Sequence, residues 1–283
     1  MSDDQVHGFS RRDFVTAAGM LPLARMTGAV ATTAAEPHPL QIQRLAWAGI
    51  RLELGDVTLF IDAIAPDPKS GQAGPPLDSS RTRRFALVTH HHGDHCDPVA
   101  LKPLLGESGY LVAHDETARL FDNRIVNVQR SRSHEPILLS RGNGEFVAWC
   151  VAGSDGLGGP QFSWIVDGGG KRVIHCGDTA WHGGWWSIAR VYGPFDAAFL
   201  PINGFRQIGG MFTHVEQPMS LTPDQAALAA RILGARMVIP IHYGGAGNAG
   251  YVEESHALER FVHASKAQGV ASRVLAPGDV IEL

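Results

Sequence analysis

The chain has 283 residues, a length that fits one large domain or two small ones. Hydrophobic residues make up 44% of it and charged residues 18%, so it can bury a substantial core and does not have a disordered composition. The formal net charge of −4 gives no basic surface, and we expect no nucleic-acid partner. The body of the chain has no uncharged apolar run of about 18 residues, so we expect no transmembrane segment in the mature protein.

The first 35 residues differ from the rest. Residues 10–15, Ser-Arg-Arg-Asp-Phe-Val, resemble the twin-arginine export motif, and a mildly apolar stretch and a run of small residues follow them. This order is typical of a signal peptide. We therefore predict that residues 1–35 are cleaved after recognition by the twin-arginine export machinery. The mature domain, residues 36–283, is then periplasmic or otherwise exported. An N-terminal helix of the mature fold is the alternative.

A β-hairpin is the first element predicted in the mature chain. Ile50, Leu52 and Leu54 alternate with polar residues, and Gly-Asp then turns the chain into a second apolar run at residues 57–61. Residues 63–80 are rich in Pro, Gly and Ser, which predicts a loop.

Residues 89–95, Thr-His-His-His-Gly-Asp-His, follow an apolar run that predicts a buried strand. Alternate residues of an extended segment point the same way, so we expect His90 and His92 to bind one cation. Asp94 and His95 follow the glycine bend and can face a second cation. Imidazole and carboxylate together are typical of zinc, iron or manganese sites. A solvated histidine run is the alternative.

The three cysteines allow at most one disulfide, and no spacing suggests one. Cys150 and Cys176 lie in strand-like runs and are expected to be buried. Cys96, directly after His95, either fills the core or approaches the metals.

Strands and helices alternate along the remaining chain, which predicts an α/β class. Helices are expected over residues 98–105, 116–121, 223–233 and 251–268, with Thr222 and Gln225 forming a capping box before the third. Strands are expected over residues 110–113, 145–152, 162–166, 172–176, 196–200, 236–241, 273–276 and 280–283. The aromatic residues 181–186 are either a helix start or a wall beside the metals.

Gly177-Asp178-Thr179 follows one of these strands. A carboxylate on such a turn can bridge two cations with one oxygen to each, and Gly177 leaves room for close approach of the backbone. A Gly-Asp-Thr sequence alone is typical of an ordinary turn, but because it follows a strand and the histidine-rich residues 89–95, we predict Asp178 as a bridging ligand.

These motifs together resemble the metallo-β-lactamase-fold hydrolases. The His-x-His-x-Asp-His motif is followed, in order, by His-Cys-Gly-Asp-Thr, Leu-Pro-Ile-Asn-Gly and Ile-Pro-Ile-His-Tyr-Gly. The nearest resemblance is to the branch of ascorbate-phosphate lactonase-like and N-acylphosphatidylethanolamine phospholipase D-like proteins. It covers about residues 40 to 283. It implies an αββα sandwich, two mixed β-sheets flanked by helices.

The resemblance also implies roles for four single residues. His242 is the expected last ligand of the second metal, and Asp62 is expected to support the metal loop. His214 matches a histidine that contacts the scissile group in the phospholipase D-like branch. Asp155 stands where the family has the third histidine ligand of the first metal. Either its carboxylate binds the metal, which makes the site more suited to iron or manganese, or the first site is weak or empty.

The predicted function is a binuclear hydrolase in which a metal-bridged hydroxide attacks an ester, lactone or phosphodiester bond. The predicted cofactors are two divalent metal ions; zinc is the preferred prediction, and iron and manganese are the alternatives. The predicted catalytic residues are Asp94 and His214, and the substrate is a small-molecule or lipid-like ester. The alternative is a non-catalytic metal- or ligand-binding protein with a degenerate first site. The oligomeric state is left open.

Overall fold

The computed structural model describes residues 38–65, 74–122, 126–140, 144–208, 217–245 and 251–283. The predicted signal peptide, residues 1–35, lies outside the described residues, and so does His214. Pro37–Leu283 form one compact unit. Within the described part of the chain, no helix is long and apolar enough to cross a membrane.

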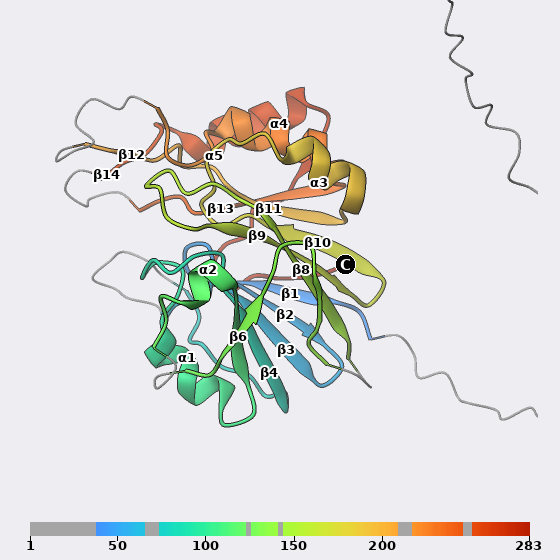
Figure 1. Ribbon diagram of the computed structural model, residues 1–283. Coiled ribbons are helices and arrows are strands. Elements are labelled where there is room, and N and C mark those ends of the chain that lie inside the picture. Colours follow the sequence, from blue (N-terminus) through green and yellow to red (C-terminus); the bar gives the residue numbers. More distant parts are fainter. Residues whose placement is uncertain (1–37, 66–73, 123–125, 141–143, 209–216, 246–250) are drawn as a thin grey trace, which may run out of the picture. The chain divides into compact units, whose positions relative to one another are not determined.

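The first sheet has seven strands in the order β16-β1-β2-β3-β4-β5-β6. Figure 1 shows β1, β2, β3 and β4 of this sheet side by side. Pairing is antiparallel from β16 to β3 and parallel from β3 to β6. The predicted hairpin is confirmed as β2 and β3, which pair Leu52 with Leu59. The strands are β1 (Gln41–Arg44), β2 (Ile50–Leu54), β3 (Val57–Ile61), β4 (Arg83–Leu87), β5 (Tyr110–His114), β6 (Val128–Ser131) and β16 (Val280–Glu282).

The second sheet also has seven strands, in the order β15-β13-β11-β10-β9-β8-β7. Its β10, β11, β13 and β15 pair in parallel, while β7 to β10 pair antiparallel. Its strands are β7 (Pro136–Leu138), β8 (Phe146–Ala152), β9 (Phe162–Gly168), β10 (Lys171–His175), β11 (Ala197–Pro201), β13 (Met237–Ile241) and β15 (Ala271–Ser272). A separate two-stranded ladder joins β12 (Arg206–Gln207) and β14 (Tyr251–Val252).

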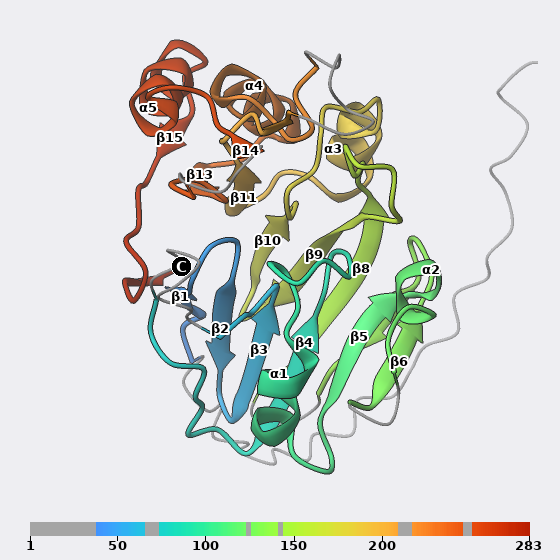
Figure 2. The same cartoon turned by 90° about the vertical axis from the view of Figure 1, so that its left-hand side faces the viewer.

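Helices cover the outer face of each sheet (Figure 2). Side chains of α1 (Pro98–Leu105) and α2 (Asp115–Ala118) pack on the first sheet in one buried cluster. Those of α3 (Trp185–Tyr192), α4 (Pro223–Leu233) and α5 (Ala257–Ala267) pack on the second sheet in another. A third cluster, which includes Leu52, Trp164 and Phe199, fills the space between the sheets. The predicted αββα sandwich is therefore confirmed.

Side-chain packing decides between the alternatives left open for the aromatic residues 181–186 and for Cys96. α3 begins at Trp185, which is fully buried, whereas Trp186 is 60% exposed, so the aromatic segment is a helix start. Cys96 packs among the buried side chains beneath α1 and so belongs to the hydrophobic core. All three cysteines are buried and free.

Two predicted elements near the C-terminus differ from the structure: the helix expected over residues 251–268 is confirmed only for Ala257–Ala267, and the strand expected over residues 273–276 is wrong. In place of one helix over residues 251–268, the chain forms β14 and then α5. Pairing of β14 with β12 is a long-range contact, reinforced by a hydrogen bond from Glu254 N–H to Asn203 O (2.7 Å), and no local periodicity reveals it. The strand expected over residues 273–276 is replaced by the short β15.

The predicted start of α4 is confirmed. Thr222 Oγ1 accepts a hydrogen bond from Gln225 N–H (3.3 Å), and Gln225 Oε1 accepts one from Thr222 N–H (3.0 Å). Gly234 ends the helix with a left-handed φ of 65°. The sequence therefore sets both ends of this helix locally.

Replacing the cap residue tests this account. Thr222→Ala should lower the free energy of unfolding by about 1 kcal/mol, because Gln225 N–H loses its acceptor. Denaturant titration measures the change. Thr222→Ser keeps the acceptor and should stay close to the parent protein, so equal losses in both variants would contradict a capping role.

Candidate metal centre

The candidate ligands follow the carboxyl ends of strands from both sheets. β3 and β4 run parallel in the first sheet, and β10 and β13 run in the same direction as β11 in the second. Because parallel strands end at the same edge of a sheet, the loops after them meet there. These loops carry Asp62, residues 89–95, Asp178 and His242.

The Asp62 carboxylate ties the loop over residues 89–95 to the end of β3. Its Oδ1 accepts a hydrogen bond from Thr89 N–H (2.8 Å). Its Oδ2 accepts from the Thr89 hydroxyl (2.7 Å) and from His95 Nδ1 (2.8 Å). These bonds confirm the supporting role predicted for Asp62 and leave His95 Nε2 free to face a cation.

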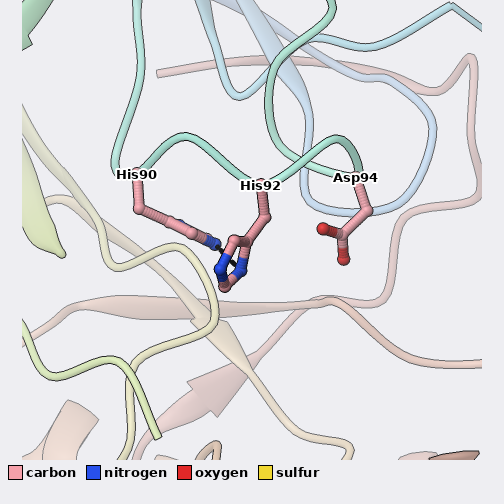
Figure 3. Close-up of side chains that lie close together, drawn as sticks. All are labelled: His90, His92 and Asp94. Carbon is pink, nitrogen blue, oxygen red and sulfur yellow. Dashed lines mark hydrogen bonds between the residues drawn. The ribbon is translucent and has the colours of Figure 1, made fainter. Parts of the chain in front are cut away.

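His90 and His92 extend from the same side of the loop and approach each other (Figure 3). His90 Nε2 lies 3.0 Å from His92 Nδ1, and Thr89 Oγ1 lies 3.1 Å from His90 Nδ1. His90 is buried, whereas the His92 side chain is 29% exposed. The two imidazoles therefore face one space, as the alternation along the loop predicts.

The turn after β10 brings Asp178 to the same space. Gly177 has a φ of 58°, and a Cβ at this position would lie 2.6 Å from Thr89 Oγ1, so the turn requires glycine. Asp178 Oδ1 lies 3.7 Å from His90 Nδ1, and Oδ2 lies 3.8 Å from His95 Nε2. One carboxylate thus faces a histidine of each predicted metal position, as a bridging ligand must.

His242 and Asp94 complete the second predicted position. His242 Nε2 lies 3.5 Å from Asp94 Oδ2 and 3.9 Å from Asp178 Oδ2. Asp94 Oδ2 also lies 3.7 Å from His95 Nε2. His242 reaches this place with a left-handed φ of 55°, a conformation that costs a non-glycine residue about 1–3 kcal/mol.

Three overlapping groups of described side chains have ligand atoms close enough to hold a metal ion. They are His90 with His92 and Asp94, His90 with His95 and Asp178, and Asp94 with His95 and His242. The structure thus brings together six predicted ligands, and metal binding by them stays a prediction.

Asp155, the seventh predicted ligand, belongs to none of these groups. Its carboxylate closes its own loop by accepting hydrogen bonds from the N–H groups of Leu157 (2.7 Å) and Gly159 (2.9 Å). Its Oδ2 nevertheless lies 3.8 Å from His92 Nε2. Because a carboxylate oxygen has lone pairs for both an N–H donor and a cation, Asp155 remains a predicted ligand.

Carboxylates dominate the charge of the centre. Burial alone lowers the pKa of His95, but Asp94, Asp178 and Asp62 outweigh it and raise this pKa to about 10. At His90 burial prevails and lowers the pKa to about 4. Because a cation binds only the deprotonated nitrogen of an imidazole, a metal ion must displace a proton from His95, and the surrounding negative charge favours the cation.

Two buried side chains near the ligands have contacts that the sequence did not predict, although His175 opens the His-Cys-Gly-Asp-Thr motif. Trp47 lies in the turn between β1 and β2, and its indole Nε1–H donates to Asp94 Oδ2 (3.1 Å). His175 donates through Nε2 to Ala48 O (2.8 Å) and accepts from Gly177 N–H at Nδ1 (3.3 Å). A lone tryptophan in a turn and a histidine at a strand end become informative only through their tertiary contacts.

Gly177→Ala tests the fit of the Asp178 turn. The added Cβ requires a left-handed alanine and clashes with Thr89, so the free energy of unfolding should fall by roughly 2–4 kcal/mol. Gly170→Ala is the matched control, because Gly170 has a φ of 72° but no atom within 4 Å of its Cβ position. It should lose only about 1 kcal/mol. Equal losses, measured by denaturant titration, would contradict the packing argument.

Known proteins are similar to this chain in sequence and in fold. The family described as Beta-lactamase superfamily domain matches residues 60–243. A UPF0173 metal-dependent hydrolase of Thermococcus kodakarensis is 31% identical over 253 residues, which cover 86% of this chain and 100% of the relative. Another, from Thermus thermophilus, is 31% identical over 209 residues, 70% of this chain and 80% of the relative.

Solved structures support the fold alone, since their identities are low. Igni18, a metallo hydrolase of Ignicoccus hospitalis, has a TM-score of 0.64 at 19% identity, covering 86% of this chain and 98% of its own. CmlA, a diiron β-hydroxylase of Streptomyces venezuelae, has a TM-score of 0.65 at 17% identity, covering 88% of this chain and 55% of its own. With the family match and a relative covered over its whole length, the chain belongs to the metallo-β-lactamase superfamily, among the UPF0173 metal-dependent hydrolases.

Proposed function

We propose that this protein uses two divalent metal ions to hydrolyse an ester, lactone or phosphodiester bond. The observation that carries the proposal is the convergence of six imidazole and carboxylate side chains on one space. The description of its relatives as metal-dependent hydrolases supports the reaction class. The type of bond rests on the resemblance to lactonase-like and phospholipase D-like proteins.

The residues at the centre fit a pair of cations. His95 Nε2, Asp178 Oδ1 and both ring nitrogens of His242 are buried and have no hydrogen-bond partner among the described residues. An unpaired buried polar atom costs roughly 1–3 kcal/mol, so cations that satisfy these atoms would stabilise the fold. The mixture of nitrogen and oxygen donors suits zinc, and iron or manganese as alternatives.

Each metal position has its own residues. His90 and His92 would hold the first cation, with Asp155 as its carboxylate ligand. Asp94, His95 and His242 would hold the second, and Asp178 would contact both, consistent with the distances from its two oxygens. When bound, the cations lower the pKa of water towards neutrality and polarise the bond under attack.

The chain's own residues orient the reactants. Asp94 has its Oδ2 held by Trp47, and its side chain is 39% exposed, so it can accept a hydrogen bond from the attacking water. Burial raises the pKa of the Asp94 carboxyl, but His95 and His242 outweigh burial and bring it below its usual value, which keeps the group ionised. His214 is proposed, from the sequence, to donate a proton to the leaving group.

We further propose that residues 1–35 direct export through the twin-arginine machinery. The substrate would then be a small-molecule or lipid-like ester encountered in the periplasm. The net charge of −4 gives no support for a nucleic-acid substrate.

One observation favours a second candidate, a non-catalytic metal- or ligand-binding protein. Asp155 is outside all three groups of potential ligands among the described residues, so the first position has, besides the shared Asp178, only two histidines from one loop. This candidate predicts a single metal ion or none.

Metal removal distinguishes the two candidates. Purified protein should contain about two metal ions per chain, and chelation should abolish hydrolysis of a panel of activated esters, lactones and phosphodiesters. Adding Zn²⁺, Mn²⁺ or Fe²⁺ should restore the hydrolysis.

A variant of the bridging residue is a separate test. Asp178→Asn should reduce kcat/KM at least about 100-fold, equivalent to about 2.7 kcal/mol. Asp78→Asn is the control, because the Asp78 side chain is 75% exposed. Absence of metal from reconstituted protein would contradict the hydrolase.

Asp155→Asn tests the first metal position. The amide oxygen can still accept the Leu157 N–H, whereas the Gly159 N–H loses its acceptor, so the loop keeps one of its two hydrogen bonds while the negative charge is lost. Elemental analysis should then find about one metal ion per chain in place of two. Unchanged stoichiometry would mean that Asp155 only closes its own loop.

A further inference from the structure

Trp47 contacts two candidate ligands of the second metal position, Asp94 and His242, which follow strands of different sheets. Its indole Nε1–H donates to Asp94 Oδ2 at 3.1 Å. Its ring packs against the His242 imidazole, with 4.3 Å between centroids and 49° between planes. Its carbonyl oxygen accepts a hydrogen bond from His242 N–H (3.3 Å).

The two histidines of this position are held in different ways. His95 donates from Nδ1 to Asp62, the usual means of fixing a ligand imidazole. His242 has no hydrogen-bond partner at either ring nitrogen among the described residues. Its orientation therefore depends on packing, which Trp47 supplies on one side and the His95 ring, with centroids 5.0 Å apart, on another.

Asp94 needs support for a different reason. Figure 3 shows its side chain separated from the paired rings of His90 and His92. It is 39% exposed, so solvent competes for its oxygens. The hydrogen bond from Trp47 holds the conformation in which Oδ2 lies 3.5 Å from His242 Nε2.

Trp47 is itself rigidly held. It is only 7% exposed and has a left-handed φ of 54°. The buried Arg44 guanidinium donates to the carbonyl oxygens of Leu45, Trp47 and Gly49, which fixes the turn. Gly245 passes close to the indole, since a Cβ there would lie 2.6 Å from the ring.

Building on the proposed function, we propose that Trp47 is a positioning residue that sets the affinity of the second metal position through Asp94 and His242. Among the described contacts, no hydrogen bond or ring contact joins Trp47 to His90 or His92, the histidines of the first position. Loss of the indole N–H should therefore weaken one metal equivalent and leave the other unchanged.

The test is a metal titration of the full-length, metal-free chain with Co²⁺, followed by its visible absorption spectrum, and with Zn²⁺ in competition. Trp47→Phe keeps an aromatic ring against His242 but removes the donor to Asp94. One of the two equivalents should bind about 10–100-fold more weakly, and the Co²⁺ spectrum of that equivalent should change. Trp185→Phe is the matched control, because Trp185 is also buried (0% exposed, against 7% for Trp47) and its indole nitrogen has no hydrogen-bond partner among the described residues.

Three results separate the possibilities. Two parental affinities in Trp47→Phe would overturn the positioning role. Equal weakening of both equivalents, with a lower melting temperature of the metal-free protein, would show a general scaffold role and also overturn it. Failure of the parent protein to bind metal would instead contradict the proposed function.

A second measurement needs no variant. In the parent protein labelled with ¹⁵N, the assigned Trp47 indole signal should shift with the midpoint of one metal equivalent. No shift at either equivalent would overturn the proposal even if Trp47→Phe does not fold.

Discussion

The hydrogen bonds to the Asp62 carboxylate are the interaction on which the metal centre depends. A fully buried carboxylate is costly unless donors surround it, and here Thr89 supplies two and His95 supplies one. The same bonds fix the start and the end of the ligand loop relative to β3. Asp62 accepts a left-handed φ of 47° to make them. The shape of the loop is therefore stabilised by hydrogen bonds within the chain itself.

The metal centre also requires that the second sheet be held in a fixed position relative to this loop. Trp164, in β9, donates its indole N–H to Val88 O (2.8 Å), and Phe162 N–H donates to Thr89 O (3.1 Å). Both bonds cross from the second sheet to the strand end that precedes His90. Together with the apolar cluster between the sheets, they place Asp178 and His242 opposite the loop.

Strained backbone conformations are concentrated at the metal centre. Of the five described non-glycine residues with positive φ, three lie at the centre, namely Trp47, Asp62 and His242. Such conformations persist only where surrounding contacts enforce them, which at this centre are hydrogen bonds and ring packing. The buried, unpartnered nitrogens of His95 and His242 add to this cost, and a bound cation would relieve it.

The sequence by itself determined those features that depend on neighbours along the chain. The loop ligands His90, His92, Asp94 and His95 could be predicted because side-chain direction alternates over a few residues. The capping box of α4 could be predicted for a similar reason. Asp178 and His242 required, in addition, the order of motifs shared with a known family.

The tertiary structure alone decided the rest. The pairing of β12 with β14 replaces a predicted helix turn, and the two oxygens of Asp155 accept hydrogen bonds from their own loop. Trp47, which precedes Asp94 by 47 positions, meets it only because the turn after β1 folds over the strand ends. Periodicity is a property of a short stretch of chain, whereas these contacts depend on how two sheets pack, and no local pattern encodes that packing.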